Sequence, residues 1–214
     1  MPCPEATIVA YCKEKGVGRM KAIRLIVPLV TCYATLRYNV FKGVAWDEWP
    51  IYVVNKVFAL SALLLVVRCI IQQRGRGSVD SKLLSVAGSL MLMHIALSLA
   101  ILDPAYYPKF FTGSKLTMQG GLSMLVGAIS AAGIHYYFRS CANREASCWI
   151  NSVGVFALLA GVHAGLLGYP SWLSPATWPG YMVPITLISF VTGVAALVIS
   201  ISARAKAVPG SAKA

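Results

Sequence analysis

Residues Ser81–Pro104, SKLLSVAGSLMLMHIALSLAILDP, form a nearly uninterrupted apolar run that is long enough to span a bilayer. One histidine, His94, lies just past the middle of this run. A second run, Trp149–Pro170, WINSVGVFALLAGVHAGLLGYP, repeats the arrangement with His163. Counted from the start of each run, the two histidines lie at nearly the same depth (94 − 81 = 13 and 163 − 149 = 14). Polar side chains inside a membrane are costly unless paired, so this placement predicts one partner that both share.

The composition is typical of a membrane protein. Of the 214 residues, 57% are apolar and only 12% are charged, and the mean hydropathy is +0.69. Soluble domains have about 25% charged residues, so the sequence predicts an integral membrane protein. No Gly-rich phosphate loop follows a strand-like segment, and a soluble nucleotide-binding domain is therefore not expected.

The apolar segments predict an all-α fold, because each is close to the roughly 20 residues that a helical span needs. We expect an integral membrane bundle of six transmembrane helices: Ile23–Tyr38, Ile51–Ile71, Leu83–Leu102, Leu116–Phe138, Ile150–Leu167 and Val183–Ala203. Residues 1–21 are expected to form a short cytoplasmic arm, residues 22–204 the six-helix domain, and residues 205–214 a cytoplasmic tail. The first span is the shortest, and Pro28 interrupts it.

The net charge of +12 is concentrated beside one set of span ends. That side holds 14 of the 19 basic residues: Lys13, Lys15, Arg19, Lys21, Arg24, Arg68, Arg74, Arg76, Lys82, Arg139, Arg144, Arg204, Lys206 and Lys213. Basic residues accumulate in cytoplasmic loops, so both termini are expected in the cytoplasm, with the protein in the inner (plasma) membrane. Topology thus explains the charge, and no nucleic-acid partner is expected.

The two histidines are suited to hold a haem. Spans three and five run in the same direction, so His94 and His163 both lie toward the outer leaflet. Two facing imidazoles can fill both axial positions of a haem iron, which suits electron transfer. The alternative is that each imidazole hydrogen-bonds a neighbouring helix. A proton or ion pathway is disfavoured, because all seven acidic residues lie in loops or at span ends.

Two basic residues near the outer ends of spans are candidates for an anionic ligand. Lys56 lies about one turn inside the second span, and Arg37 lies at the end of the first. A long basic side chain at such a position commonly extends outward to the headgroups. The alternative is that Lys56, with Arg37 as a weaker candidate, contacts the propionates of a haem.

The remaining candidates have simpler interpretations. Small residues in the fourth span, Gly120, Gly121, Gly127 and Gly133, predict close approach of another helix or a flat ligand. His135 is expected to be solvated at the cytoplasmic end. The cysteines, Cys3, Cys12, Cys32, Cys69, Cys141 and Cys148, are expected to be free thiols, because a reducing compartment disfavours disulfides and their spacing is not that of a metal site.

Three segments together carry a resemblance to a known family. They are Trp49–Leu65, WPIYVVNKVFALSALLL; Leu83–Phe111, LLSVAGSLMLMHIALSLAILDPAYYPKFF; and Gly161–Phe190, GVHAGLLGYPSWLSPATWPGYMVPITLISF. Their layout and composition resemble the ferric reductase-like transmembrane family, the six-helix haem-b core shared by ferric reductases, NADPH oxidases and the membrane subunit of methionine-sulfoxide reductase systems.

The resemblance implies that His94 and His163 match the outer of two histidine pairs, each of which holds one haem in the family. The inner pair would lie 13 residues earlier (94 − 13 = 81 and 163 − 13 = 150), where this chain has Ser81 and Ile150, followed by Asn151. One haem b is therefore expected. The family's flavin and nicotinamide domains have no counterpart here, so a quinol or a redox partner protein is expected to deliver electrons.

The sequence thus predicts a membrane b-type cytochrome that transfers electrons across or within the membrane as the haem-binding component of an oxidoreductase. No catalytic residue is assigned. Two alternatives stay open: an accessory subunit of an oligomer or larger membrane complex, and a small transporter, which the Gly-rich fourth span would favour.

Overall fold

A computed structural model describes residues 21–76, 80–142 and 150–206 of the chain. Almost all of the predicted arm, 1–21, and most of the predicted tail, 205–214, lie outside these ranges. The described part is mostly helical, which confirms the all-α class. Its long helices are residues 21–35, α2 (Val54–Arg76), α3 (Ser81–Ala100), α4 (Met118–Ala142), α5 (Ile150–Gly168) and α6 (Ile185–Lys206).

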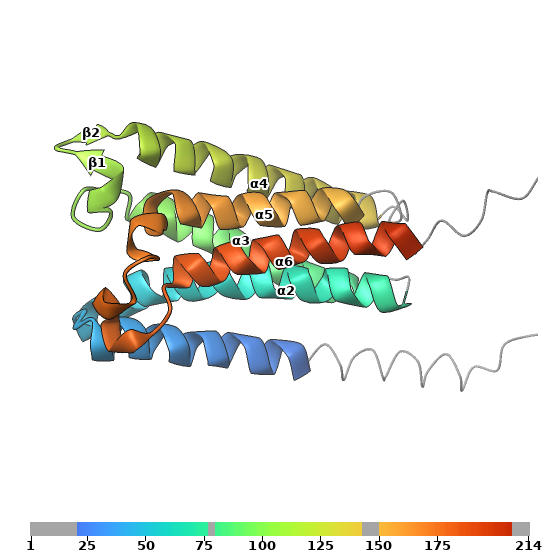
Figure 1. Cartoon of the computed structure of the whole chain (residues 1–214), viewed down its shortest axis with the longest axis horizontal. Coiled ribbons are helices and arrows are strands. Elements are labelled where there is room, and N and C mark those ends of the chain that lie inside the picture. The colour runs from blue at the N-terminus through green and yellow to red at the C-terminus, as the bar shows by residue number, and fades with distance from the viewer. Residues whose placement is uncertain (1–20, 77–79, 143–149, 207–214) are drawn as a thin grey trace, which may run out of the picture.

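Short elements gather at one end of the bundle, which we call the loop end (Figure 1). They are the helical turns η1 (Leu36–Phe41), η2 (Trp46–Glu48), η3 (Trp49–Val53), η4 (Pro108–Phe110), η5 (Tyr169–Ser171), η6 (Pro175–Thr177) and η7 (Pro179–Tyr181), and a small hairpin of β1 (Phe111–Thr112) and β2 (Lys115–Leu116). The hairpin pairs Phe111 with Leu116 and Thr112 with Lys115 in antiparallel register. Gly113, with φ of 60°, makes its turn.

Five helices in the described ranges are long and apolar enough to cross a membrane. They comprise Trp46–Arg74, Lys82–Ala100, Met118–Arg139, Ser152–Ser171 and Pro179–Ser202, and they match the predicted second to sixth spans to within a few residues at most ends. The first predicted span, Ile23–Tyr38, is helical over residues 21–35 and continues into η1, with Pro28 inside the helix, but it is not among the five.

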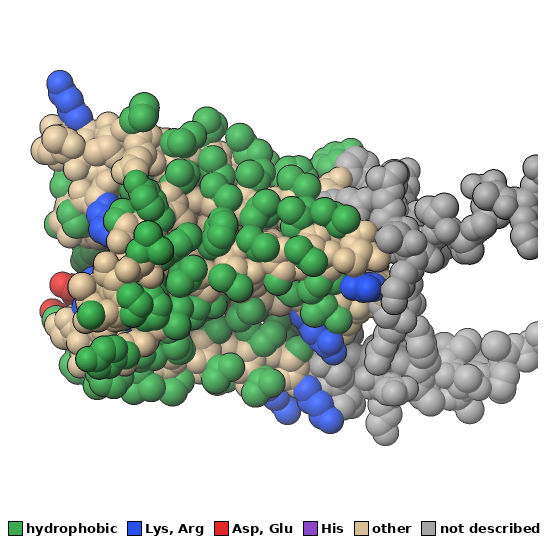
Figure 2. Space-filling model, in the orientation of Figure 1, with side chains coloured by type: hydrophobic (Ala, Val, Ile, Leu, Met, Phe, Trp, Pro, Cys, Tyr) green, Lys and Arg blue, Asp and Glu red, His purple; other side chains and the backbone are tan. Residues whose placement is uncertain are grey.

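Long helices that follow one another in the sequence run in opposite directions, so residue 21 and the end of α6 both lie at the end opposite the loop end (Figure 1). Helix α5 packs closely on α4 and α6, and α2 packs on α3 and α6. Apolar side chains cover the length of the bundle in the view shown, while Lys and Arg lie toward its two ends (Figure 2). This distribution is the one expected of a surface that faces lipid.

Two clusters of buried apolar side chains hold the bundle together. The larger one draws on α2 to α6 and includes Leu65, Leu83, Val153 and Ala196. The smaller one joins the first helix to α2 and α6 through residues such as Val30, Val57 and Ile185. The first helix is therefore part of the packed bundle.

Glycines bring the backbones of α5 and α6 into direct contact. A Cβ atom added at Gly161 would lie 2.9 Å from Phe190 Cα, and one added at Gly193 would lie 2.6 Å from the carbonyl oxygen of Ala157. Close approach through small residues is a common way for membrane helices to associate. In α4, by contrast, the glycines receive side chains of α5: the ring of Phe156 packs on Gly133 and that of His163 on Gly127.

We expect Gly193→Ala to lower the free energy of unfolding by about 1–3 kcal/mol, because the new methyl group meets backbone that cannot move aside. Unfolding of the protein in detergent micelles measures this change. Gly121→Ala is the control, because its added Cβ meets only a Leu116 methyl group, at 3.5 Å. Equal stability of the two variants would contradict the close α5–α6 contact.

Candidate functional site

The two predicted histidines face each other inside the bundle. His94 comes from α3 and His163 from α5, and their ring centroids are 6.5 Å apart with an angle of 73° between the ring planes. Their helices are fixed by different neighbours, since α3 packs mainly on α2 whereas α5 packs on α4 and α6. The structure thus brings together two side chains that are 69 positions apart in the sequence (163 − 94 = 69).

The imidazole of His94 is held by α2. Its Nδ1 lies 2.7 Å from Oδ1 of Asn55 and 3.2 Å from the backbone carbonyl oxygen of the same residue. A carbonyl oxygen only accepts hydrogen bonds, so Nδ1 of His94 carries the proton. In a neutral imidazole, Nε2 then carries the lone pair.

The imidazole of His163 is held in the same way by α4. Its Nδ1 donates to the backbone carbonyl oxygen of Ser123 at 2.7 Å, and the hydroxyl of Ser123 donates to the carbonyl oxygen of His163 at 2.9 Å. The ring rests on Gly127, where an added Cβ would lie 2.7 Å from Nδ1. Both histidines therefore use Nδ1 as the donor to a neighbouring helix.

Asn55 connects the His94 ring to the loop end. The Asn55 side chain is only 2% exposed. Its Nδ2 donates to the hydroxyl of Tyr107 at 2.8 Å and to that of Ser98 at 3.0 Å, while its Oδ1 accepts from His94. One buried amide thus ties together α2, α3 and the segment that leads into η4.

The Nε2 atoms remain available to a ligand. Within residues 21–76, 80–142 and 150–206, neither Nε2 has a hydrogen-bond partner. A metal ion bound by two imidazole nitrogens at about 2.0–2.1 Å, with each ring centre ~1.1 Å beyond its nitrogen, would separate the ring centres by about 6.3 Å. The observed 6.5 Å fits such a pair of ligands.

The two histidines supply two ligand atoms, and no further side chain of a usual metal-binding type joins them among the described residues. Among the described residues, no group of three or more His, Cys, Asp or Glu could hold a metal ion. Two axial nitrogens are what a metal needs when a porphyrin provides its other ligands. The two imidazoles therefore match the axial ligand set of a haem, and the haem itself stays a prediction.

The two predicted propionate contacts, Lys56 and Arg37, have partners of their own at the loop end. Nζ of Lys56 donates to the carbonyl oxygen of Tyr52 at 2.9 Å and lies 3.2 Å from the centre of the Tyr52 ring. Arg37 is 7% exposed, and its Nη1 donates to the carbonyl oxygen of Met182. Their contact with a propionate stays a prediction.

The other candidates lie away from the pair. His135 is exposed near the end of α4. Cys32 is exposed and Cys69 is buried, while Cys3, Cys12, Cys148 and the side chain of Cys141 lie outside what is described. Ser81 and Ile150, at the positions of the family's inner pair, are the first residues of α3 and α5.

Asn55, Ser123 and Tyr107 are site residues that the sequence pattern does not predict. Asn55 and Ser123 could have been predicted from the rule that a buried imidazole N–H needs a hydrogen-bond acceptor. Asn55 and Ser123 are polar residues in the outer parts of the second and fourth predicted spans, on the same side of the membrane as the histidines.

No protein-family model matches the chain, and no curated protein matches it in sequence.

We expect Asn55→Leu to lower the free energy of unfolding by about 1–3 kcal/mol, because the hydroxyl of Tyr107 and Nδ1 of His94 each lose a buried partner. Unfolding in micelles measures the change. Thr192→Val is the control, since that hydroxyl bonds only the Ile188 carbonyl oxygen of its own helix. A loss no larger than that of the control would show that the Asn55 network contributes nothing to stability.

Proposed function

We propose that the protein is a membrane b-type cytochrome that binds one haem between His94 and His163 and transfers electrons across or within the membrane. The observation that carries the proposal is the pairing of two imidazoles whose Nδ1 atoms are tied to other helices. Ligating histidines usually donate the second ring nitrogen to a carbonyl or carboxylate group. Both rings here have that arrangement.

The hydrogen bonds alone do not account for the pair. A histidine that only ties two helices together needs one nitrogen, and its second nitrogen then stays unpaired in an apolar environment, which is costly. Both rings would bear this cost. A ligand shared by both Nε2 atoms removes it.

The residues have distinct tasks in this proposal. His94 and His163 bind the iron, Asn55 and Ser123 fix the orientation and the proton of each ring, and the surrounding helices exclude water. When bound, the haem supplies a one-electron redox centre, and two axial histidines favour electron transfer over direct oxygen chemistry.

A single haem leaves the source of electrons to a partner. A quinol or a redox protein would deliver them, and the chain would act as the haem-binding component of a ferric reductase-like oxidoreductase. The assignment to that family stays a proposal, supported by the three segments that resemble it and by the facing histidines on the third and fifth predicted spans. Lys56 and Arg37 stay predicted contacts of the propionates.

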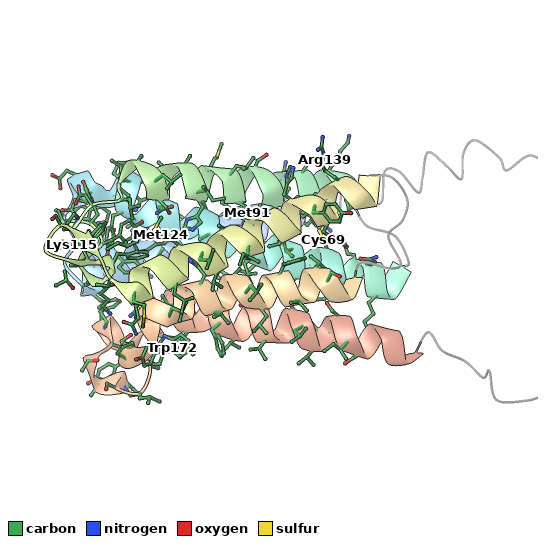
Figure 3. The ribbon with its side chains drawn as sticks, turned by 90° about the horizontal axis from the view of Figure 1, so that it is seen from above. Cys69, Met91, Lys115, Met124, Arg139 and Trp172 are labelled. Carbon is green, nitrogen blue, oxygen red and sulfur yellow. The ribbon has the colours of Figure 1, made fainter. Side chains whose placement is uncertain are left out.

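We also propose six spans, with both termini in the cytoplasm of a cell whose inner (plasma) membrane holds the protein. The first helix packs on α2 and α6 within the bundle, and both described ends lie opposite the loop end (Figure 1). Lys115 lies at the loop end and Arg139 toward the other end (Figure 3). The excess of basic residues at the second end supports its cytoplasmic location.

The haem is tested by a reduced-minus-oxidised visible spectrum of protein purified in detergent after haem-replete expression. Sharp b-type bands with about one haem per chain are expected, and they should be lost in His94→Ala and in His163→Ala. His135→Ala, which removes an exposed histidine, should keep them. A colourless wild-type protein would rule out the cytochrome and favour an accessory subunit or a transporter.

The topology is tested by labelling with a membrane-impermeant maleimide in intact cells. Lys115→Cys should react from outside, whereas Lys21→Cys and Arg139→Cys should react only after permeabilisation. Labelling of Lys21→Cys together with Lys115→Cys would show that the first helix does not cross the membrane, leaving five spans.

A further inference from the structure

Three basic side chains gather around two tyrosine rings at the loop end. Relative to the centre of the Tyr38 ring, Cζ of Arg37 lies at 5.9 Å, Nζ of Lys42 at 5.7 Å and Nζ of Lys56 at 5.0 Å. The Tyr52 ring has Lys42 at 5.6 Å and Lys56 at 3.2 Å. The two rings meet edge to face at 5.5 Å. We call these five residues the cationic cage.

The positive charge of the cationic cage has no ion-pair partner among the described residues, although Asp47 and Glu48 of η2 also lie at the loop end. In the part of the chain that the structure describes, no carboxylate forms an ion pair with Arg37, Lys42 or Lys56. The faces of aromatic rings attract cations but carry no net charge. Two ammonium groups that share the same two rings also repel each other. An anion between them would remove this imbalance.

The cationic cage also has unused hydrogen-bond donors. Each ammonium group has three N–H donors. Lys42 uses one on the hydroxyl of Tyr52, at 3.2 Å, and Lys56 uses one on the carbonyl oxygen of Tyr52. Nε of Arg37 is buried and has no hydrogen-bond partner among the described residues. A ligand with several strong acceptor oxygens would satisfy these donors.

The position of the cationic cage points to the headgroup layer. Lys42 is exposed, and the next turns along the chain carry Trp46 and Trp49, which are typical of a membrane interface. Lys56 is half-buried, and its amine reaches back one helical turn, to Tyr52. The charge is thereby moved toward the loop end and away from Asn55, the residue that holds His94.

We propose that the cationic cage binds the phosphate of an anionic phospholipid headgroup. Phosphate oxygens accept short, charge-assisted hydrogen bonds from Lys and Arg, and a net negative headgroup balances the excess charge, whereas a choline headgroup brings a further cation. A haem propionate is the competing occupant, disfavoured by the outward direction of Lys56. The proposal needs no haem, so a colourless protein would leave it intact.

The test compares the wild-type full chain with its variants. Each protein is placed in bilayer nanodiscs of phosphatidylcholine, phosphatidylglycerol is added, and native mass spectrometry counts the lipid molecules that stay bound. Each hydrogen bond from a lysine of the cationic cage to the phosphate strengthens binding of the lipid roughly fivefold. The double variant Lys42→Gln, Lys56→Met should therefore bind phosphatidylglycerol about thirtyfold more weakly than the wild type. The matched control, Lys109→Gln with Lys115→Gln, removes the same charge from the loop end outside the cationic cage and should bind as the wild type does.

Two further measurements keep the test decisive. If the double variant does not fold, Lys42→Gln alone, at an exposed position, should weaken binding about fivefold. Replacing both lysines of the cationic cage by arginine keeps the charge and should preserve binding.

Several results would overturn the proposal. Equal losses in the cage and control variants would mean that charge at the loop end acts without a site. Equal binding of phosphatidylcholine would show that no net negative headgroup is selected. Inorganic phosphate that competes at the same concentration as lipid would identify a free oxyanion instead. Loss of lipid binding only when haem is bound would identify a propionate.

Discussion

The arrangement of the bundle depends on one constraint: an imidazole N–H inside a membrane must find its acceptor in the protein. His94 finds it on α2 and His163 finds it on α4. Each bond fixes how far one helix is shifted along its neighbour and how far it is rotated about its axis. Since both bonds start from Nδ1, neither Nε2 has a hydrogen-bond partner among the described residues, and a ligand shared by the two rings becomes chemically reasonable.

The helix pairs are held by different means. α5 and α6 touch through backbone at Gly161 and Gly193, which permits little relative motion. Between α4 and α5, the glycines instead form recesses for the rings of Phe156 and His163. The small residues of α4 therefore allow close approach, as the sequence predicts, but at Gly127 and Gly133 it is side chains of α5 that approach. α5 is consequently fixed on both sides, and His163 has the more rigid support.

The features that depend on composition could be predicted from the sequence. Those that depend on how each helix is rotated about its own axis could not. Hydropathy placed five of the spans, and the equal depth of His94 and His163 in their apolar runs predicted that the two rings lie level with each other. Asn55 and Ser123 escaped prediction because depth alone does not tell which face of a helix meets its neighbour. The outward direction of Lys56, by contrast, is the one expected of a long basic side chain near a helix end, and the carbonyl oxygen and ring of Tyr52 receive its ammonium group. The first helix, with only residues 21–35 in regular α form, marks where hydropathy stops being decisive.

The two imidazoles differ in what holds them. Ser123 offers His163 a main-chain oxygen, which every amino acid at that position would also offer. Asn55 offers His94 a side-chain oxygen at 2.7 Å besides its main-chain oxygen at 3.2 Å, and a single codon change removes the side-chain oxygen or turns the amide into a carboxylate. Natural variation can therefore alter the electron-donating strength of one ring while the other stays constant. If the pair binds the proposed haem, position 55 is the simple place at which its redox potential could change.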